Sequence, residues 1–335
     1  MKSPKADVIV VGGGLAGLTA ARRLSELNIR VVILESSDEV GGRLATIRIG
    51  NGWADAGAQF FTVRAPEFEQ MVSQWLAGGL VFEWSRGWSN GSPASSLPDS
   101  YPRYAAYGGF GTFARRLAEG MDIQYSIRVV SISHTDNEWK LSDSTGQLWH
   151  STGIILTPPV SQTLGLLDAE TVWLPAKERY LLEAITYAPC LCGLFEIDGA
   201  PSLPEPGVVQ RPAAPITWIA DNRRKGVSSG ASVVTVHASP WESRRRYSMT
   251  KQVVLEWMLK EVQPWLPRGG RVGNAQLVRW PYAIPETLYP GRCLAGNWPG
   301  PMALAGDAFD GPRMEGAVLS GMAAADALFE RYNFT

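Results

Sequence analysis

The feature that most constrains the fold is a glycine turn between an apolar run and a helical pattern, close to the first residues of the sequence. The β-branched run at residues 7–11 predicts a strand, and Gly12, Gly14 and Gly17 follow with the G-x-G-x-x-G spacing. In such a turn the first glycine bends the chain, the second admits a phosphate to the backbone, and the third lets a helix pack on the strand. The N–H groups at the helix start can then face the phosphates.

A second strand follows at the distance expected for a dinucleotide-binding unit. Residues 31–34 are apolar and β-branched, and Glu35 stands at their end, where an acid can hold a ribose hydroxyl. A helix is predicted over residues 15–27, and its buried face is formed by Ala20, Ala21, Leu24 and Leu27. A right-handed crossover makes the two strands parallel. The alternative is an ordinary glycine turn in an α/β protein.

Size and charge exclude several classes of function. A chain of 335 residues can hold two lobes or one large α/β domain, and 45% hydrophobic residues suit a globular core. A net charge of −1 and a pI of about 6.4 point to neither nucleic acid nor an anionic membrane. We expect a cytoplasmic protein without signal peptide or membrane span. The 13 tryptophans suggest an aromatic-lined cavity.

The cysteines do not predict a metal site. The spacing of Cys190 and Cys192 is too tight for zinc, and no histidine cluster accompanies them. Together with Cys293 they are expected to be buried free thiols in a reducing compartment.

Further motifs extend the pattern to the end of the chain. Gly41-Gly42-Arg43 follows the second strand, and residues 53–64 contain D-x-G-A and G-A-Q-F-F-T. Gly306-Asp307 precedes R-x-E-G-A-x-L-S-G at residues 313–321. Together they resemble the glutathione-reductase-like FAD fold of the amine oxidase and renalase group. G-A-Q-F-F-T and R-x-E-G-A are similar to bacterial renalase-like proteins in particular.

This resemblance implies an α/β fold: a Rossmann-like FAD-binding domain of the glutathione-reductase/amine-oxidase type with a second, mainly antiparallel substrate-binding domain. The predicted FAD-binding domain comprises residues 1–76, 106–160 and 290–335, and the substrate-binding domain comprises residues 77–105 and 161–289. The predicted helices cover residues 15–27, 66–77, 112–119 and 248–263, and the strands after the first two include 123–134, 137–142, 147–156, 190–197, 216–220, 231–237 and 275–282.

The resemblance also implies non-covalently bound FAD. The residues expected to bind it are Gly12, Gly14, Leu15, Ala16, Gly17, Glu35, Ser36, Gly42, Arg43, Ala58, Gln59, Phe60, Val129, Thr157, Asp307, Arg313, Met314, Glu315 and Ala317. Arg43 would bind the diphosphate, Asp307 a ribityl hydroxyl, and the helix starting near Glu315 would direct N–H groups at flavin N1 and O2. A surface ion pair for Arg43 and a helix cap for Asp307 are the alternatives.

The activity implied by the resemblance is of the renalase type. FAD takes a hydride at N5 from 2- or 6-dihydro isomers of NAD(P)H, NAD(P)+ leaves, and O2 is reduced to hydrogen peroxide. Asn222 and His237 are expected to bind the nicotinamide amide, and Gln59, Trp280 and Tyr282 to serve as walls or donors. Each could instead be a core residue with satisfied hydrogen bonds.

Two other functions stay open. An amine oxidase acting on a small amine often needs a lysine that holds water at flavin N5. Lys225 lies in a polar Arg-Arg-Lys-Gly turn and is expected to face solvent. A non-catalytic flavin-binding module has no sequence support. The partners expected are a small molecule and O2, in a monomer or weak dimer. Segments 85–103 and 296–301 depart from the resemblance and could set substrate choice.

Overall fold

The computed structural model describes residues 6–92, 101–167, 170–267 and 270–331. The chain divides into two compact units. Unit 1 comprises residues 1–42, 114–186 and 285–335, and unit 2 comprises residues 43–113 and 187–284.

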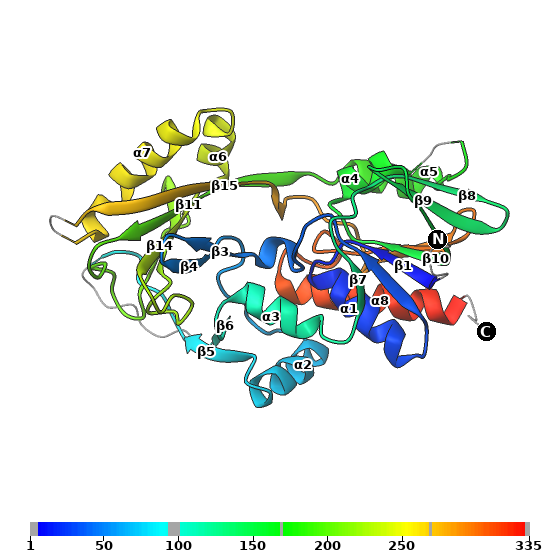
Figure 1. Ribbon diagram of the computed structural model, residues 1–335, viewed down its shortest axis with the longest axis horizontal. Helices are drawn as coiled ribbons and strands as arrows, with labels where there is room; N and C mark the ends of the chain where they lie inside the picture. Colours follow the sequence, from blue (N-terminus) through cyan, green and yellow to red (C-terminus); the bar gives the residue numbers. More distant parts are fainter. Residues whose placement is uncertain (1–5, 93–100, 168–169, 268–269, 332–335) are drawn as a thin grey trace. The chain divides into compact units, whose positions relative to one another are not determined.

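Unit 1 is built on an eight-stranded sheet whose central strands are parallel (Figure 1). The path runs β16-β17-β10-β1-β2-β7, and β9 pairs with both β10 and β8. The strands are β1 (Ala6–Val11), β2 (Val31–Leu34), β7 (Asp122–Gln124), β8 (Val129–Thr135), β9 (Glu138–Asp143), β10 (Leu148–Leu156), β16 (Leu294–Asn297) and β17 (Pro301–Leu304). Because β1 has parallel neighbours on both sides, it is almost entirely buried.

Two long helices of unit 1 pack against each other (Figure 1): α1 (Leu15–Glu26) and α8 (Met314–Arg331). A Cβ atom on Gly321 would lie 2.3 Å from the carbonyl oxygen of Ala16, so only glycine allows this approach. The helix α4 (Val160–Leu166) packs on β8, and α5 (Ala176–Glu183) packs on α4.

Unit 2 is built on a five-stranded sheet in the order β12-β13-β14-β11-β15. Its strands are β11 (Tyr187–Ile197), β12 (Val208–Gln210), β13 (Ile216–Asp221), β14 (Ser232–Ala238) and β15 (Val272–Pro285). The pairings of β12 with β13, β13 with β14, and β14 with β11 are antiparallel.

Side chains alternate between the two faces of this sheet. Phe195 and Val234 point to one face, where they meet Val254 and Met258 of α7 (Lys251–Val262). Leu194 and Val233 point to the other, the inner face, and pack against the hairpin of β3 (Thr46–Ile49) and β4 (Gly52–Asp55). Figure 1 shows α7 and the hairpin on opposite sides of the sheet. The remaining elements are α2 (Pro66–Ala77), β5 (Val81–Ser85), β6 (Arg103–Ala106), α6 (Pro240–Arg246) and η2 (Gln263–Trp265), while η1 (Gly42–Leu44) and α3 (Phe110–Leu117) cross the unit boundary.

The compact units divide the chain differently from the predicted domains in four segments, of which the shortest, residues 285–289, belongs to unit 1 instead of the predicted substrate-binding domain. Residues 43–76 and 106–113 belong to unit 2, because the β3–β4 hairpin packs on β14 and β11. Residues 161–186 belong to unit 1, because α4 packs on β8.

The α/β fold with an antiparallel second sheet is confirmed, as are most elements. The predicted strand 123–134 is wrong in one respect: it is two strands, β7 and β8, because Ser126 has a φ of 59° and interrupts the extended chain. The predicted helix 112–119 starts earlier, at Phe110, and the helix 248–263 starts at Lys251, because the Thr250 side chain caps it by accepting from Val253 N.

The expectation for segment 296–301 is corrected. This segment forms the turn of the β16–β17 hairpin, at the amino end of β17. Because β17 runs parallel to β10 and β1, this turn lies at the opposite end of the strand from the edge that carries Gly12 and Thr157. Trp139 Nε1 donates to Pro301 O at 2.9 Å and fixes the hairpin to β9. A role in substrate choice therefore has no support in its position.

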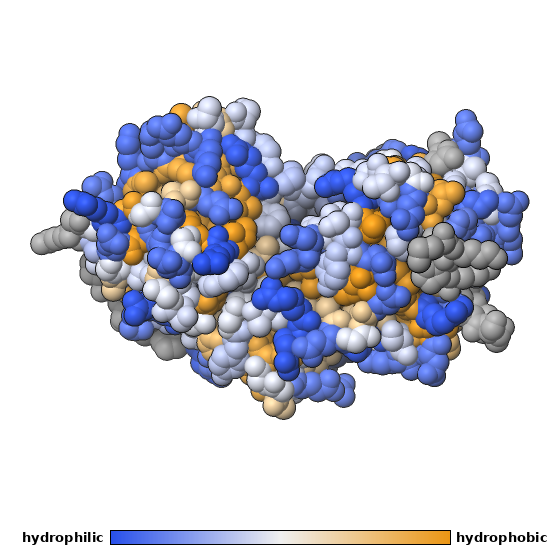
Figure 2. All heavy atoms as spheres, viewed as in Figure 1, coloured by the Kyte–Doolittle hydropathy of each residue, from blue (hydrophilic) through white to orange (hydrophobic). Residues whose placement is uncertain are grey.

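No helix within the described ranges is long and apolar enough to cross a membrane. The visible surface mixes hydrophilic and hydrophobic residues (Figure 2), and Lys251, Gln252 and Lys260 of α7 are exposed. Cys190, Cys192 and Cys293 are free thiols, and burial raises the pKa of Cys190 to about 12.

Candidate functional site

The carboxyl edge of the parallel strands in unit 1 gathers residues predicted to bind a dinucleotide. Gly12 follows β1, Glu35 follows β2, Thr157 follows β10 and Asp307 comes shortly after β17. These four strands are parallel to one another, so their carboxyl ends meet at one edge of the sheet. Thr157 Oγ1 donates to Val11 O at 2.8 Å and so ties β10 to the first glycine turn.

Glycine suits the three positions of this turn for different physical reasons. Gly12 has a φ of 101°, and a Cβ atom on Gly17 would lie 2.0 Å from Gly12 O. Gly14 has an ordinary φ of −72°, and a Cβ atom there would meet nothing within 4 Å. Gly14 also precedes α1 without a side-chain cap, so the N–H groups of the first turn of α1 face an open cradle. This cradle fits the pyrophosphate of FAD.

Glu35 is buried and oriented by backbone donors. Its Oε2 accepts from Gly13 N at 2.6 Å, and its Oε1 accepts from Ser37 N at 2.8 Å and from Ser36 Oγ at 3.2 Å. The carboxylate thus lies beside the glycine turn, and its predicted contact with a ribose hydroxyl stays a prediction.

The second glycine pair packs on the same turn. Gly41 N donates to Gly13 O at 2.8 Å, and a Cβ atom on Gly42 would lie 3.9 Å from Gly14 Cα. Arg43 Nη1 donates to the carbonyls of Tyr282 and Ala283, each at 3.1 Å. The predicted contact of Arg43 with a diphosphate stays a prediction.

The start of α8 carries the other predicted residues of unit 1. Asp307 does not cap a helix, because α8 begins at Met314, and this removes the alternative considered for it. A Cβ atom on Gly316 would lie 2.1 Å from Gly311 O, so the turn before α8 packs tightly onto its first residues. The structure places the remaining predicted residues as follows: Met314 and Glu315 are buried in the first turn of α8, Ala317 is half-buried, Arg313 is exposed, Leu15 and Ala16 are buried at the start of α1, and Val129 is buried at the start of β8.

In unit 2, the predicted substrate residues converge on the segment from Asp55 to Gln59. Gln59 Nε2 donates to Asp55 O at 2.7 Å, and Trp280 Nε1 donates to Ala56 O at 2.9 Å. Asn222 Oδ1 accepts from Asp55 N at 3.1 Å, while its Nδ2 donates to Thr235 Oγ1 at 2.8 Å. The amide of Asn222 is fully buried and bonded at both ends, so it orients this segment.

Tyr282, the remaining predicted substrate residue of this unit, and Ala58, which was predicted to bind FAD, have other surroundings. Tyr282 packs edge-on against Tyr187, with ring centroids 5.5 Å apart. Ala58 N donates to Arg43 O at 2.9 Å, and a Cβ atom on Gly57 would lie 2.0 Å from the same oxygen.

An aromatic group stands next to these residues on the inner face of the sheet. We call it the aromatic face; it consists of Phe60, Trp84, Trp88, Trp218 and His237. Phe60 stacks on Trp218 at 5.3 Å and contacts Trp88 at 5.2 Å, and Trp84 lies 4.9 Å from Trp88. Trp218 is the cross-strand partner of His237, and its Nε1 donates to Gln59 Oε1 at 3.2 Å. This group includes part of segment 85–103, whose residues 93–100 lie outside the described residues.

Three buried polar atoms of the aromatic face have no hydrogen-bond partner in the described part of the chain: Trp84 Nε1, Trp88 Nε1 and His237 Nε2. Burial lowers the pKa of His237 from 6.5 to about 4, although a bond to the Ala56 backbone opposes the shift. His237 is therefore neutral at pH 7. The aromatic face thus combines two donors with a neutral imidazole nitrogen.

Lys225 was predicted to face solvent, and that prediction is wrong. Its side chain is fully buried, and Nζ lies 2.7 Å from Oδ2 of Asp55, which is also fully buried. The ammonium also lies over the rings of Trp84 and Phe110, at 5.1 and 5.3 Å. Sequence reasoning missed this pair. The one available signal was a carboxylate within a buried strand, since such a charge requires a partner.

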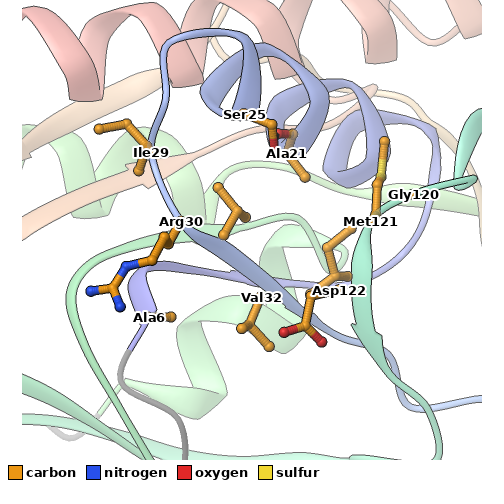
Figure 3. A pocket seen from close by; sticks show the side chains of 11 residues that line it. Ala6, Ala21, Ser25, Ile29, Arg30, Val32, Gly120, Met121 and Asp122 are labelled. Atoms are coloured by element: carbon orange, nitrogen blue, oxygen red, sulfur yellow. The ribbon is translucent and has the colours of Figure 1, made fainter.

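A separate hollow in unit 1 is lined by none of the candidate site residues (Figure 3). Ala6, Val31 and Asp122, which line it, are the first residues of β1, β2 and β7. The hollow therefore lies at the amino ends of these strands, opposite to the glycine turn.

Comparisons with known proteins agree with this geometry. The family model "Flavin containing amine oxidoreductase" matches residues 73–329, and "NAD(P)-binding Rossmann-like domain" matches residues 10–75. Amine oxidase [flavin-containing] B of Mus musculus is 49% identical over 59 residues, which are 17% of this chain and 11% of that protein. Amine oxidase [flavin-containing] A of Sus scrofa is 47% identical over 55 residues, which are 16% and 10% of the two chains. The matched segment thus spans about a tenth of these curated relatives.

Solved structures are similar over nearly the whole chain. Cyclohexylamine oxidase from Brevibacterium oxydans IH-35A has a TM-score of 0.75 at 13% identity, and the match covers 98% of this chain and 100% of that one. A putative protoporphyrinogen oxidase from Exiguobacterium sp. 255-15 has a TM-score of 0.73 at 14% identity, with 99% and 100% covered. At this level of identity the likeness concerns the fold.

Proposed function

Because this chain belongs to the flavin-containing amine oxidoreductase family, we propose that it is an FAD-dependent oxidase of the renalase type. Its substrates would be the 2- and 6-dihydro isomers of NAD(P)H, and the reaction would be dihydro-NAD(P) + O2 + H+ → NAD(P)+ + H2O2. Bound FAD would supply the two-electron acceptor that takes the hydride and passes its electrons to O2.

The observation that carries this proposal is the set of unpartnered polar atoms on the aromatic face. A nicotinamide has a flat ring, which aromatic side chains can stack on, and a carboxamide, which both donates and accepts hydrogen bonds. The indole N–H groups of Trp84 and Trp88 can donate to a carbonyl oxygen, and the neutral His237 can bond an amide. Buried polar atoms usually have partners, so the lack of a partner for these atoms among the described residues favours a ligand that supplies one.

The proposed reaction requires little of the protein beyond binding and orienting the substrate and FAD. The ring nitrogen of a dihydropyridine supplies the electron push for hydride loss, so no general base is required. Trp280 and Gln59 would hold the segment around Ala56 that borders the nicotinamide. Gly14, Glu35 and the start of α1 would hold the pyrophosphate and a ribose of FAD.

An amine oxidase is the second candidate, because the curated relatives carry that name. One feature expected of such an enzyme is a lysine free to hold a water at the flavin. Lys225 is paired with Asp55 and fully buried, so it does not meet this requirement.

Anaerobic stopped-flow mixing separates the two candidates. The flavin absorbance at about 450 nm would be followed after mixing with 2- or 6-dihydro-NAD(P), and separately with a panel of small amines. We expect fast bleaching by the dihydronicotinamides, with NAD(P)+ as product. Bleaching by amines alone would support the second candidate and refute the first.

A pair of variants links this activity to the aromatic face. His237→Phe should keep its FAD and weaken dihydronicotinamide binding by about 3- to 10-fold, the cost of one hydrogen bond. His150→Phe, which removes a histidine of unit 1 bonded to Glu138, is the matched control and should bind as the wild type does.

A further inference from the structure

We propose that Lys225 is a positioning residue: through Asp55 it fixes the Gly57–Phe60 turn and thereby the aromatic face against which the substrate binds. The proposal rests on the proposed function for its kinetic consequence alone. Its structural consequence, the placement of the turn, can be measured without any substrate.

Asp55 connects four parts of unit 2. Its Oδ1 accepts from Thr46 Oγ1 at 2.6 Å and from Phe110 N at 2.9 Å, which ties β4 to β3 and to the start of α3. Its carbonyl oxygen accepts from Gln59 Nε2 and from Thr235 Oγ1, at 2.7 and 3.0 Å. The position of this one residue thus sets the turn that follows it.

Lys225 holds the remaining oxygen of Asp55. Neither Asp55 Oδ2 nor Lys225 Nζ has another hydrogen-bond partner among the described residues. Burial lowers the pKa of Lys225, and the negative charge of Asp55 opposes this shift. Such a pair stays in place because a lone buried charge costs more than a paired one.

The same ammonium also reaches the aromatic face. Nζ lies 5.1 Å from the ring of Trp84, which contacts Trp88 and Trp218. Gln59 is bonded to both Asp55 and Trp218, so the turn and the aromatic face are linked through two routes that begin at the ion pair. Lys225 itself has no exposed surface and does not touch a substrate.

The test uses holoenzyme labelled with 5-fluorotryptophan and observed by 19F NMR, with Trp84 and Trp218 assigned by substitution. Lys225→Met leaves the Asp55 carboxylate buried and unpaired, so the double variant Asp55→Asn/Lys225→Met, which keeps an acceptor for Thr46 and Phe110, is measured beside it. The control is Arg223→Met, which removes a positive charge from an exposed side chain in the same turn.

In the double variant we expect the Trp218 and Trp84 resonances to shift by more than a linewidth and the visible flavin spectrum to change shape, with FAD content retained. The limiting rate of flavin bleaching by dihydronicotinamide should fall about 10- to 100-fold, while the apparent Kd changes little. Arg223→Met should match the wild type in every measurement.

Unchanged tryptophan resonances and an unchanged flavin spectrum in the double variant would overturn the proposal. Failure of the double variant to fold, with Arg223→Met folded, would also overturn it, because the pair would then serve folding rather than positioning. If the wild type does not oxidise dihydronicotinamides, the proposed function fails, and the NMR and flavin spectra still decide the role of Lys225.

Discussion

The Cβ position of Gly17 lies 2.0 Å from the carbonyl oxygen of Gly12, whereas that of Gly14 has no atom within 4 Å. Two glycines of one motif therefore serve different ends. Gly17 is required by the protein's own packing, whereas the space at Gly14 is open, as expected if a pyrophosphate binds there.

These two positions should separate folding from cofactor binding. Gly17→Ala should lower the free energy of unfolding of the apoprotein by about 1–3 kcal/mol, because the methyl group overlaps a backbone atom. Gly14→Val should leave the stability of the apoprotein nearly unchanged and abolish FAD binding. Urea unfolding and flavin absorbance after gel filtration measure the two effects. A Gly14→Val protein that keeps full FAD would show that the glycine turn does not bind the pyrophosphate.

Glu35 should contribute both to the stability of the glycine turn and to the affinity for FAD. In Glu35→Gln, one amide oxygen replaces two acceptors, so the N–H of Gly13 or Ser37 loses its bond, at a cost of about 1–3 kcal/mol in stability. FAD affinity should fall about tenfold through the lost carboxylate. Isothermal titration of the apoprotein measures the affinity. Glu39→Gln is the control, because Glu39 forms a surface pair with Arg115 that is worth little; equal effects of the two changes would contradict the role of Glu35.

The first glycine turn and the position of Glu35 could be predicted because the sequence patterns that indicate them lie within a short stretch of the chain. A β-branched run, a fixed glycine spacing and an acid after the next strand determine that unit within residues 7–35. Of the aromatic face, Phe60 and His237 were named among the candidate site residues from the sequence, whereas Trp84, Trp88 and Trp218 were not.

Most of the predictions that failed concern features that depend on contacts between residues far apart in the sequence. The turn around Lys225 is polar, which suggests exposure, and the ammonium is buried because it pairs with the buried carboxylate of Asp55, a residue far away in the sequence. The position of segment 296–301 depended on which end of β17 it precedes, and no local pattern contains that information. A single positive φ at Ser126 divided one predicted strand into two.

The low pKa of His237 predicts a specific pH dependence of stability. Between pH 6.5 and about 4 the unfolded chain binds more protons at this residue than the folded chain does. The contribution of His237 is therefore fully present above pH 6.5 and is lost as the pH falls toward 4, by at most about 3 kcal/mol. Urea unfolding at several pH values should show a shallower loss in His237→Asn than in the wild type. Parallel curves for the two proteins would indicate that the imidazole titrates normally in the folded state.

The last prediction concerns the two segments that depart from the family resemblance. Trp88→Phe keeps an aromatic ring in edge-on contact with Phe60 but removes the N–H that has no partner among the described residues, so it should weaken dihydronicotinamide binding about 3- to 10-fold and leave stability nearly unchanged. Gly300→Ala should do the reverse. A Cβ atom there would lie 2.4 Å from His134 Nε2, which should cost about 1–3 kcal/mol of stability, while substrate binding per folded molecule stays constant. Stopped-flow titrations and urea unfolding of both variants give the four values. If Gly300→Ala changes the substrate preference and Trp88→Phe does not, segment 296–301 determines the choice of substrate. The aromatic face is then not part of the binding site.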